Sequence, residues 1–205
     1  MAQLSLFSAE ARPVRLADLA GLLCGPGQIA RFGTGETARL SIVLPDADRA
    51  PAVRAAAAAT GIRLEPAAAE DGAPTLRTAF RCDLVGLAQL WTRGATKAVP
   101  EHFQLDGPLL RLWALAAGRA DERGGYLLLL DPDVPGTHQP LVAAATRAGI
   151  SPARVGPADR EWELGGPALR ISGARRMQRL VELVGPPPER VPAAAWPRYW
   201  GRNGA

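Results

Sequence analysis

Residues 16–27 read LADLAGLLCGPG, and residues 107–119 read GPLLRLWALAAGR. Each stretch places leucines and alanines at the three- and four-residue spacing of a helix that buries one face. The first helix is expected from about Leu16 to Cys24, because Gly25-Pro26-Gly27 cannot continue it. The two similar stretches lie in different halves of the chain, which raises the question of whether the halves are copies.

The residues that follow each stretch also match, and they do so in the same order. The paired segments are TARLSIVLPD (37–46) with GYLLLLDPD (125–133), AVRAAAAATGI (52–62) with PLVAAATRAGI (140–150), and APTLRTAFRCDLVGLAQLW (73–91) with GPALRISGARRMQRLVELV (166–184). Repetition of this kind predicts two structural repeats.

Each half reads as helix, strand, strand, helix, strand, strand, helix, an α+β fold with antiparallel sheets. Leu40 and Ile42 alternate with Arg39 and Ser41, as in a sheet with one buried and one solvent-exposed face. In the first half, strands are expected at 28–32, 37–44, 62–66 and 75–80, and later helices at 50–60 and 83–91.

The expected domains are a first repeat over 14–95 and a second over 96–185, packed as one unit. Segment 1–13 is expected to be a docking peptide with its linker, and 186–205 a tail, both short and flexible. The aromatic side chains of the tail either stack on nucleic-acid bases or pack back onto the body. They are Trp196, Tyr199 and Trp200.

Composition narrows the class of protein. Hydrophobic residues make up 47% of the 205 residues and charged residues 21%, which excludes a disordered chain. The net charge of +4 permits a polyanionic partner without requiring one. Cys24 and Cys82 are expected to be buried free thiols, and His102 and His138 surface residues. We expect no metal, no cofactor and, without a signal peptide or an apolar run of membrane length, a cytoplasmic location.

Two copies of this element order, each opening on a stretch such as Leu19-Ala20-Gly21-Leu22-Leu23, resemble the LAGLIDADG homing-endonuclease fold. The second stretch with its continuation, Arg111–Leu130, resembles more closely the LAGLIDADG-like N-terminal part of WhiA-type sporulation regulators. The resemblance covers roughly Leu16 to Val184. It implies that the two motif helices cross at a pseudo-twofold axis through small residues. It also implies that the sheets form a saddle, which in the family lies on duplex DNA.

Nuclease members of the family carry an acidic residue at the end of each motif helix, and these carboxylates bind the divalent metal. The corresponding positions here are Pro26 and Ala117, whose side chains cannot bind a metal. The resemblance therefore implies a relative that has lost cleavage. A residual metal-dependent nuclease is an alternative that would depend on Asp121 or Glu122.

The saddle would still offer a polar face to DNA, because arginines on a concave sheet suit phosphate contacts. Arginines also alternate with apolar residues on any half-exposed strand, so a plain solvated face is the alternative. The candidate DNA-binding residues are Arg39, Ser41, Arg77, Arg81, Arg170, Ser172, Arg175 and Arg176.

Gln3-Leu4-Ser5-Leu6-Phe7 resembles the peptide by which bacterial replication and repair proteins bind the sliding clamp. Leu6 and Phe7 would fill an apolar pocket, Leu4 adds a smaller contact, and Gln3 offers a donor and an acceptor at the rim. The alternative is an edge strand that buries Leu4 and Leu6 on the body.

Together these features predict a monomeric, nucleoid-associated accessory protein of DNA replication or repair that is not an enzyme. Its expected partners are the sliding clamp and double-stranded DNA. The alternative is a WhiA-like transcriptional regulator in which the opening residues are only structural. WhiA-type regulators carry a helix-turn-helix after this fold, and none is expected after Val184.

Overall fold

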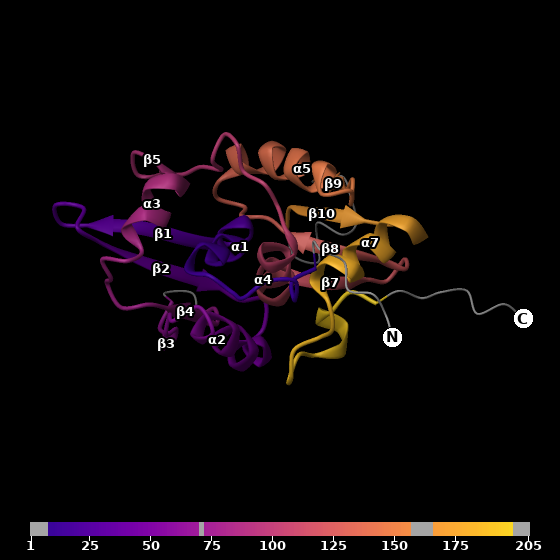
Figure 1. The fold of residues 1–205 in the computed structure, drawn as a ribbon, viewed down its shortest axis with the longest axis horizontal. Coiled ribbons are helices and arrows are strands. Elements are labelled where there is room, and N and C mark those ends of the chain that lie inside the picture. The colour runs from indigo at the N-terminus through magenta and orange to yellow at the C-terminus, as the bar shows by residue number, and fades with distance from the viewer. Residues whose placement is uncertain (1–7, 70–71, 157–165, 199–205) are drawn as a thin grey trace, which may run out of the picture.

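The computed structural model describes residues 8–69, 72–156 and 166–198, and its two halves have the same arrangement (Figure 1). Each half contains a four-stranded antiparallel sheet, with strand order β1-β2-β4-β3 in the first half and β7-β8-β10-β9 in the second. The predicted α+β fold with antiparallel sheets is confirmed, and the shared strand order is the one that two repeats require.

The first half opens on a 3-10 turn that runs directly into helix α1. Its elements are η1 (Leu16–Leu19), α1 (Ala20–Cys24), β1 (Gly27–Phe32), β2 (Thr37–Val43), η2 (Ala47–Arg49), α2 (Ala50–Ala58), β3 (Glu65–Ala67), β4 (Thr75–Arg77) and α3 (Val85–Trp91). The strand predicted at 62–66 begins only at Glu65, because β4 pairs with Glu65–Ala67 alone, and Ile62 and Leu64 are buried in the loop that leads to it.

A hairpin, β5 (Thr92–Arg93) and β6 (Thr96–Lys97), lies in the stretch that joins the halves. The remaining elements are α4 (Gly107–Ala117), β7 (Gly118–Asp121), β8 (Gly125–Leu129), η3 (Pro135–Thr137), α5 (His138–Arg147), β9 (Ala153–Val155), β10 (Ala168–Ile171), α7 (Ala174–Val184) and η4 (Ala193–Ala195). In the described ranges, no helix has the length and apolar character needed to span a membrane.

The repeat extends to individual hydrogen bonds. The backbone N–H of Leu44 donates to the carbonyl oxygen of Pro74, and that of Leu130 donates to Pro167, both at 2.8 Å. These bonds attach the end of β2 to the chain before β4, and the end of β8 to the chain before β10. Pro74 and Pro167, which occupy matching positions in the two repeated sequence segments, therefore also accept matching hydrogen bonds.

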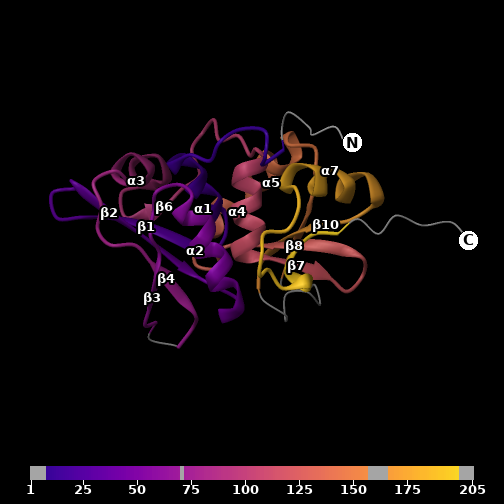
Figure 2. The ribbon, with the colours of Figure 1, turned by 60° about the horizontal axis from the view of Figure 1, so that its bottom comes forward.

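Helices α1 and α4 pack against each other in the middle of the molecule, between the two sheets (Figure 2). A methyl group on Gly21 would overlap the carbonyl oxygen of Leu109, and one on Gly25 would lie 2.9 Å from the Cβ of Ala117. Backbones this close leave no room for a side chain at either glycine. The motif helices thus cross at small residues, as the resemblance implies.

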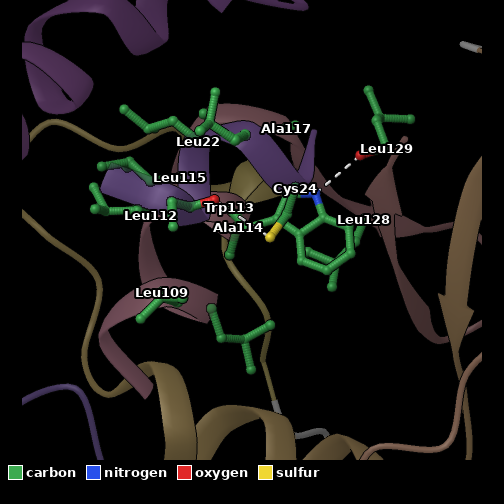
Figure 3. Close-up of a cluster of buried hydrophobic side chains, with 14 of the residues drawn as sticks. Leu22, Cys24, Leu109, Leu112, Trp113, Ala114, Leu115, Ala117, Leu128 and Leu129 are labelled. Atoms are coloured by element: carbon green, nitrogen blue, oxygen red, sulfur yellow. Dashed lines mark hydrogen bonds between the residues drawn. The ribbon is translucent and has the colours of Figure 1, made fainter. Parts of the chain in front are cut away.

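Leucines of both helices and one tryptophan build the core around this crossing (Figure 3). Trp113 of α4 is fully buried, and its Nε1 donates to the carbonyl oxygen of Leu129 at 2.9 Å. The bond satisfies the indole donor and joins α4 to the end of β8. Cys24 lies in the same core, where burial raises the pKa of its thiol and makes it unreactive.

Two predicted environments are wrong. Cys82, expected to be buried, is exposed because it lies in the turn that leads from β4 into α3. His138, expected on the surface, is buried at the start of α5, where its Nε2 lies 2.7 Å from the carbonyl oxygen of Asp131. Cys24 is buried and His102 is exposed, as predicted.

The described part of the predicted tail, residues 186–198, packs on the second half. The hydroxyl of Tyr126 donates to the carbonyl oxygen of Ala195 at 2.6 Å. Trp196 is buried, and its Nε1 donates to the carbonyl oxygen of Gly185 at 3.1 Å. Of the two alternatives for the tail aromatics, packing on the body holds for Trp196, whereas Tyr199 and Trp200 lie outside the described residues.

The close approach of α1 to α4 predicts a large effect of one methyl group. We expect Gly21→Ala to lower the free energy of unfolding by about 3 kcal/mol, because the helices must move apart. Chemical denaturation followed by circular dichroism measures this. In the control Gly86→Ala, the added Cβ meets nothing within 4 Å and lies in helix α3, so stability should be unchanged or rise by up to about 1 kcal/mol. Equal stability of both variants would contradict the tight crossing.

Candidate nucleic-acid interface

The first sheet has one face covered by helices and one open face. In β2, Ala38, Leu40 and Ile42 are fully buried on the helix side, whereas Arg39 and Ser41 lie on the other side. The strand register brings one residue from each strand into a line across the open face. We name this line the polar row, and its members are Gln28, Ser41, Arg77 and Glu65.

Arg39 and Arg77 supply positive charge to the open face. The Nε of Arg77 lies 3.5 Å from the Oγ of Ser41, so the two side chains are neighbours. Glu65, the acidic end of the polar row, pairs with Arg54 at 3.4 Å. In the described part of the chain, neither Arg39 nor Arg77 forms an ion pair with a carboxylate. Among the described residues, the charges of Arg39 and Arg77 are thus not neutralised by an ion pair, although Glu65 lies opposite Arg77 in the strand register.

The second sheet has no equivalent open polar face among the residues described. Leu127 stands where the first half has Ser41, and it is buried together with Leu129. Beside it, Arg170 donates from Nε to Oδ2 of Asp121 at 2.6 Å, and the Asp121 side chain is almost fully buried. The charge of Arg170 is thus balanced by a carboxylate within the sheet.

The predicted DNA-binding residues do not gather on one surface. Arg39, Ser41 and Arg77 lie together on the open face. Arg81 instead forms a two-bond ion pair with Asp83, at 2.6 and 2.9 Å. The others lie in the second half, where Arg170 is in β10 and the rest line a groove of about 910 Å³ between the end of α5 and the start of α7, namely Ser172, Arg175 and Arg176.

The ends of the motif helices carry no acidic side chain. Pro26 follows Gly25, which caps α1, and Ala117 is the buried last residue of α4. Throughout the described residues, no group of three His, Cys, Asp or Glu side chains could hold a metal ion. At the end of α1 the charged group is instead an ammonium.

The ammonium group of Lys97 binds the end of α1. Its Nζ donates to the carbonyl oxygens of Gly25 at 2.9 Å and Gly27 at 2.7 Å, and to Oδ2 of Asp131 at 2.5 Å. The side-chain amide of Gln28 donates to the same carboxylate oxygen at 2.5 Å. We name these five residues the Lys97 cluster. It connects hairpin β5–β6 with the end of the first motif helix and with Asp131, the second residue beyond β8.

The two charged side chains of the Lys97 cluster are buried, since Lys97 and Asp131 are 1% and 2% exposed, whereas Gln28 lies at the edge of the cluster and is exposed to solvent. Burial lowers the pKa of the Lys97 ammonium, and the Asp131 carboxylate opposes this shift. Buried charges are costly unless they are paired and hydrogen-bonded. The Lys97 ammonium and the Asp131 carboxylate meet both conditions. This pair was not predicted from the sequence. The available signal was that Lys97 is the only lysine, at a place where a compact ammonium fits three acceptors better than a planar guanidinium.

Comparison with solved structures identifies the fold. The chain is similar to the homing endonuclease I-WcaI bound to its DNA recognition sequence, with a TM-score of 0.55 and 11% identity, over 90% of this chain and 83% of that one. It is also similar to full-length DUF199/WhiA from Thermotoga maritima, with a TM-score of 0.52 and 12% identity, over 87% of this chain and 56% of that one. No protein-family model and no curated protein matches the sequence. The fold is LAGLIDADG-like and similar to that of WhiA, as predicted, and identities this low establish the fold alone.

The Lys97 cluster predicts a large effect of removing the buried cation. We expect Lys97→Met to lower the free energy of unfolding by about 3–5 kcal/mol, because Asp131 is left buried without a positive partner. The exposed neighbour Arg93 provides the control, and Arg93→Met should change stability by no more than about 0.5 kcal/mol. Thermal and chemical denaturation measure both.

A double variant tests whether the two charges act together. Lys97→Met/Asp131→Asn removes both charges and keeps an acceptor for Gln28, so it should be more stable than Lys97→Met alone. If instead the losses of the two single variants simply add, the charges do not depend on each other and the account of the cluster is wrong.

Proposed function

We propose that this protein binds double-stranded DNA on the open face of its first sheet and does not cleave it. One observation carries the proposal: Arg39, Ser41 and Arg77 lie side by side on an open sheet face, and neither arginine is paired with an acid among the described residues. Such arginines suit phosphate oxygens, and the neighbouring hydroxyl can donate to them. The similarity in fold to an endonuclease solved on its DNA recognition sequence supports a nucleic acid as the ligand.

The ends of the motif helices support a non-catalytic role. Pro26 and Ala117 offer no carboxylate, and Asp131, which lies beside the end of α1, is bound to the Lys97 ammonium. A divalent cation at that place would have to displace a buried positive charge. A residual nuclease would instead depend on Asp121 or Glu122. The ion pair of Asp121 with Arg170 counts against that alternative.

Removing positive charge from the open face should weaken DNA binding. For Arg39→Gln/Arg77→Gln, we expect the slope of log affinity against log salt concentration to fall by about 1 for each arginine. Fluorescence anisotropy with a labelled duplex over a salt series measures this slope. In the presence of magnesium the duplex should stay intact. Cutting that Asp121→Asn abolishes would support the residual nuclease instead.

The matched control removes two exposed arginines elsewhere, one on hairpin β5–β6 and one in the segment after α7. Arg93→Gln/Arg190→Gln changes the net charge equally but leaves the open face intact, so the salt slope should stay as in the unchanged protein. An equal loss in both double variants would mean that net charge, rather than the open face, determines binding.

We also propose that Gln3-Leu4-Ser5-Leu6-Phe7 recruits this protein to the bacterial sliding clamp, which would make it an accessory factor of replication or repair. The pentapeptide lies outside the described residues, so the support comes from its sequence. Directly after it, the backbone N–H of Ala9 donates to the carbonyl oxygen of Leu183 at 2.8 Å. The body therefore anchors the chain just beyond the pentapeptide, which would keep a bound clamp close to the first residues of the fold.

Calorimetric titration of the full-length protein with the sliding clamp tests recruitment. Leu6→Ala/Phe7→Ala should abolish binding, because these side chains would fill the apolar pocket of the clamp. Circular dichroism must show an unchanged fold. No binding by the unchanged protein would rule out recruitment, and unfolding of the variant would mean that Leu6 and Phe7 belong to the body.

A WhiA-like regulatory role is the second candidate, and the similarity in fold to full-length WhiA favours it. This role implies binding to selected DNA sequences and indifference to the clamp. Competition between promoter fragments and random duplexes of equal length, next to the clamp titration, separates the two candidates.

A further inference from the structure

Two phenylalanine rings lie exposed at the end of hairpin β1–β2 that points away from α4 (Figure 1). Phe32 is 63% exposed and Phe80 is 41% exposed, yet their ring centroids are 4.7 Å apart. Single exposed apolar side chains are common on proteins, whereas two exposed rings in contact, here tilted by 37° to each other, form a small apolar surface on the described part of the chain. The pair therefore needs an explanation other than packing.

The strand register places both rings on the open face. Phe32 lies four residues beyond Gln28 of the polar row in β1. Residues an even number of positions apart on a strand point to the same face, so both side chains lie on the same side of the sheet. Ala38 faces the helices and forms a β-bridge with Arg81. Partners in a bridge point to the same side, so the residue before Arg81, Phe80, points to the opposite, open side. The rings thus share the face that carries the polar row.

Arg39 lies against one of the two rings. Its guanidinium carbon lies 4.5 Å from the centroid of the Phe80 ring, a cation–π contact. The nearby carboxylate of Asp83 is bound to Arg81, so it does not compete for Arg39. We name Phe32, Phe80 and Arg39 the aromatic cluster. It combines two partly exposed aromatic rings with a positive charge on a single surface.

This combination favours one class of ligand. An apolar protein surface would match the rings but not a guanidinium, whereas a nucleotide offers a base to the rings and a phosphate to the arginine. Stacked bases inside a duplex keep their faces covered, so only a base that has left the stack can meet the rings. Arg77, on the same face, would contact the flanking backbone.

We propose that the aromatic cluster is a stacking site for an unpaired DNA base, and that the protein therefore prefers duplexes that contain one. This inference rests on the proposed DNA binding by the open face and specifies the DNA structure that the face accepts. Stacking of one base on an aromatic side chain is strong enough for about a tenfold preference over a fully paired duplex.

The test compares two duplexes of the same sequence, one fully paired and one with a single bulged 2-aminopurine, at one salt concentration. The full-length protein should bind the bulged duplex about tenfold more tightly, and stacking should quench the 2-aminopurine fluorescence. Phe32→Ala/Phe80→Ala should lose both the preference and the quenching but keep its affinity for the paired duplex. The control Leu90→Ala removes an exposed apolar side chain from α3 and should behave as the unchanged protein.

Each other outcome has a distinct meaning. Equal affinity of the unchanged protein for both duplexes, without quenching, overturns the stacking site and leaves DNA binding intact. Absence of binding to either duplex overturns the proposed function and the stacking site together. If light scattering shows a dimer that the double variant converts to a monomer, the rings bind a second copy and the stacking site is wrong. Phe32→Ala alone, which changes the more exposed ring, replaces the double variant if that one unfolds.

Discussion

The contact between the backbones of α1 and α4 is the constraint on which the rest of the structure depends. The space beside Gly21 is filled by the Leu109 carbonyl, and the space beside Gly25 by the Cβ of Ala117. Strand β7 begins directly after α4, at Gly118, and β1 begins at Gly27, after Gly25 and Pro26, the two residues that follow α1. The helix crossing therefore determines where both sheets start and how far apart they lie, and larger residues at the crossing would displace every strand.

The same crossing explains why a buried lysine is tolerated. The junction from α1 to β1 meets the junction from β8 to α5, which leaves backbone carbonyls and the Asp131 carboxylate beside a buried space. Such an oxygen-rich surrounding binds cations in proteins. The chain supplies its own cation from hairpin β5–β6, so the oxygens of Gly25 and Gly27 are satisfied without an ion from solution. An ammonium suits this role because its three N–H groups can turn toward three acceptors. The balance of charge at this site therefore depends on three segments of the chain: the end of α1, hairpin β5–β6 and the segment at Asp131.

The fold could be predicted because its signals are local in the sequence, whereas ion pairs between distant residues could not be predicted. The alternation around Leu40 and Ile42 and the repeated alanine-rich helices identify elements because each signal lies within a few residues. Lys97 and Asp131 are 34 positions apart, and Arg170 and Asp121 are 49 apart, so no local pattern links them. Neighbours on one strand face, such as Arg39 and Ser41, could be placed together from sequence. The orientation of side chains beyond the strand ends could not be predicted from the sequence, because tertiary packing sets it.

The two halves share a topology but not a surface. In the first, the sheet face presents Ser41 and arginines to solvent, whereas in the second the corresponding face buries Leu127 and balances Arg170 with Asp121. With one open sheet face among the described residues, the pseudo-symmetric body has a direction along its long axis. A rod-like ligand that bound to that sheet would contact the protein on one side of the crossing only, so its two ends would not be equivalent. Palindromic symmetry in such a ligand would have no counterpart on the protein, and each molecule bound would define an upstream and a downstream side.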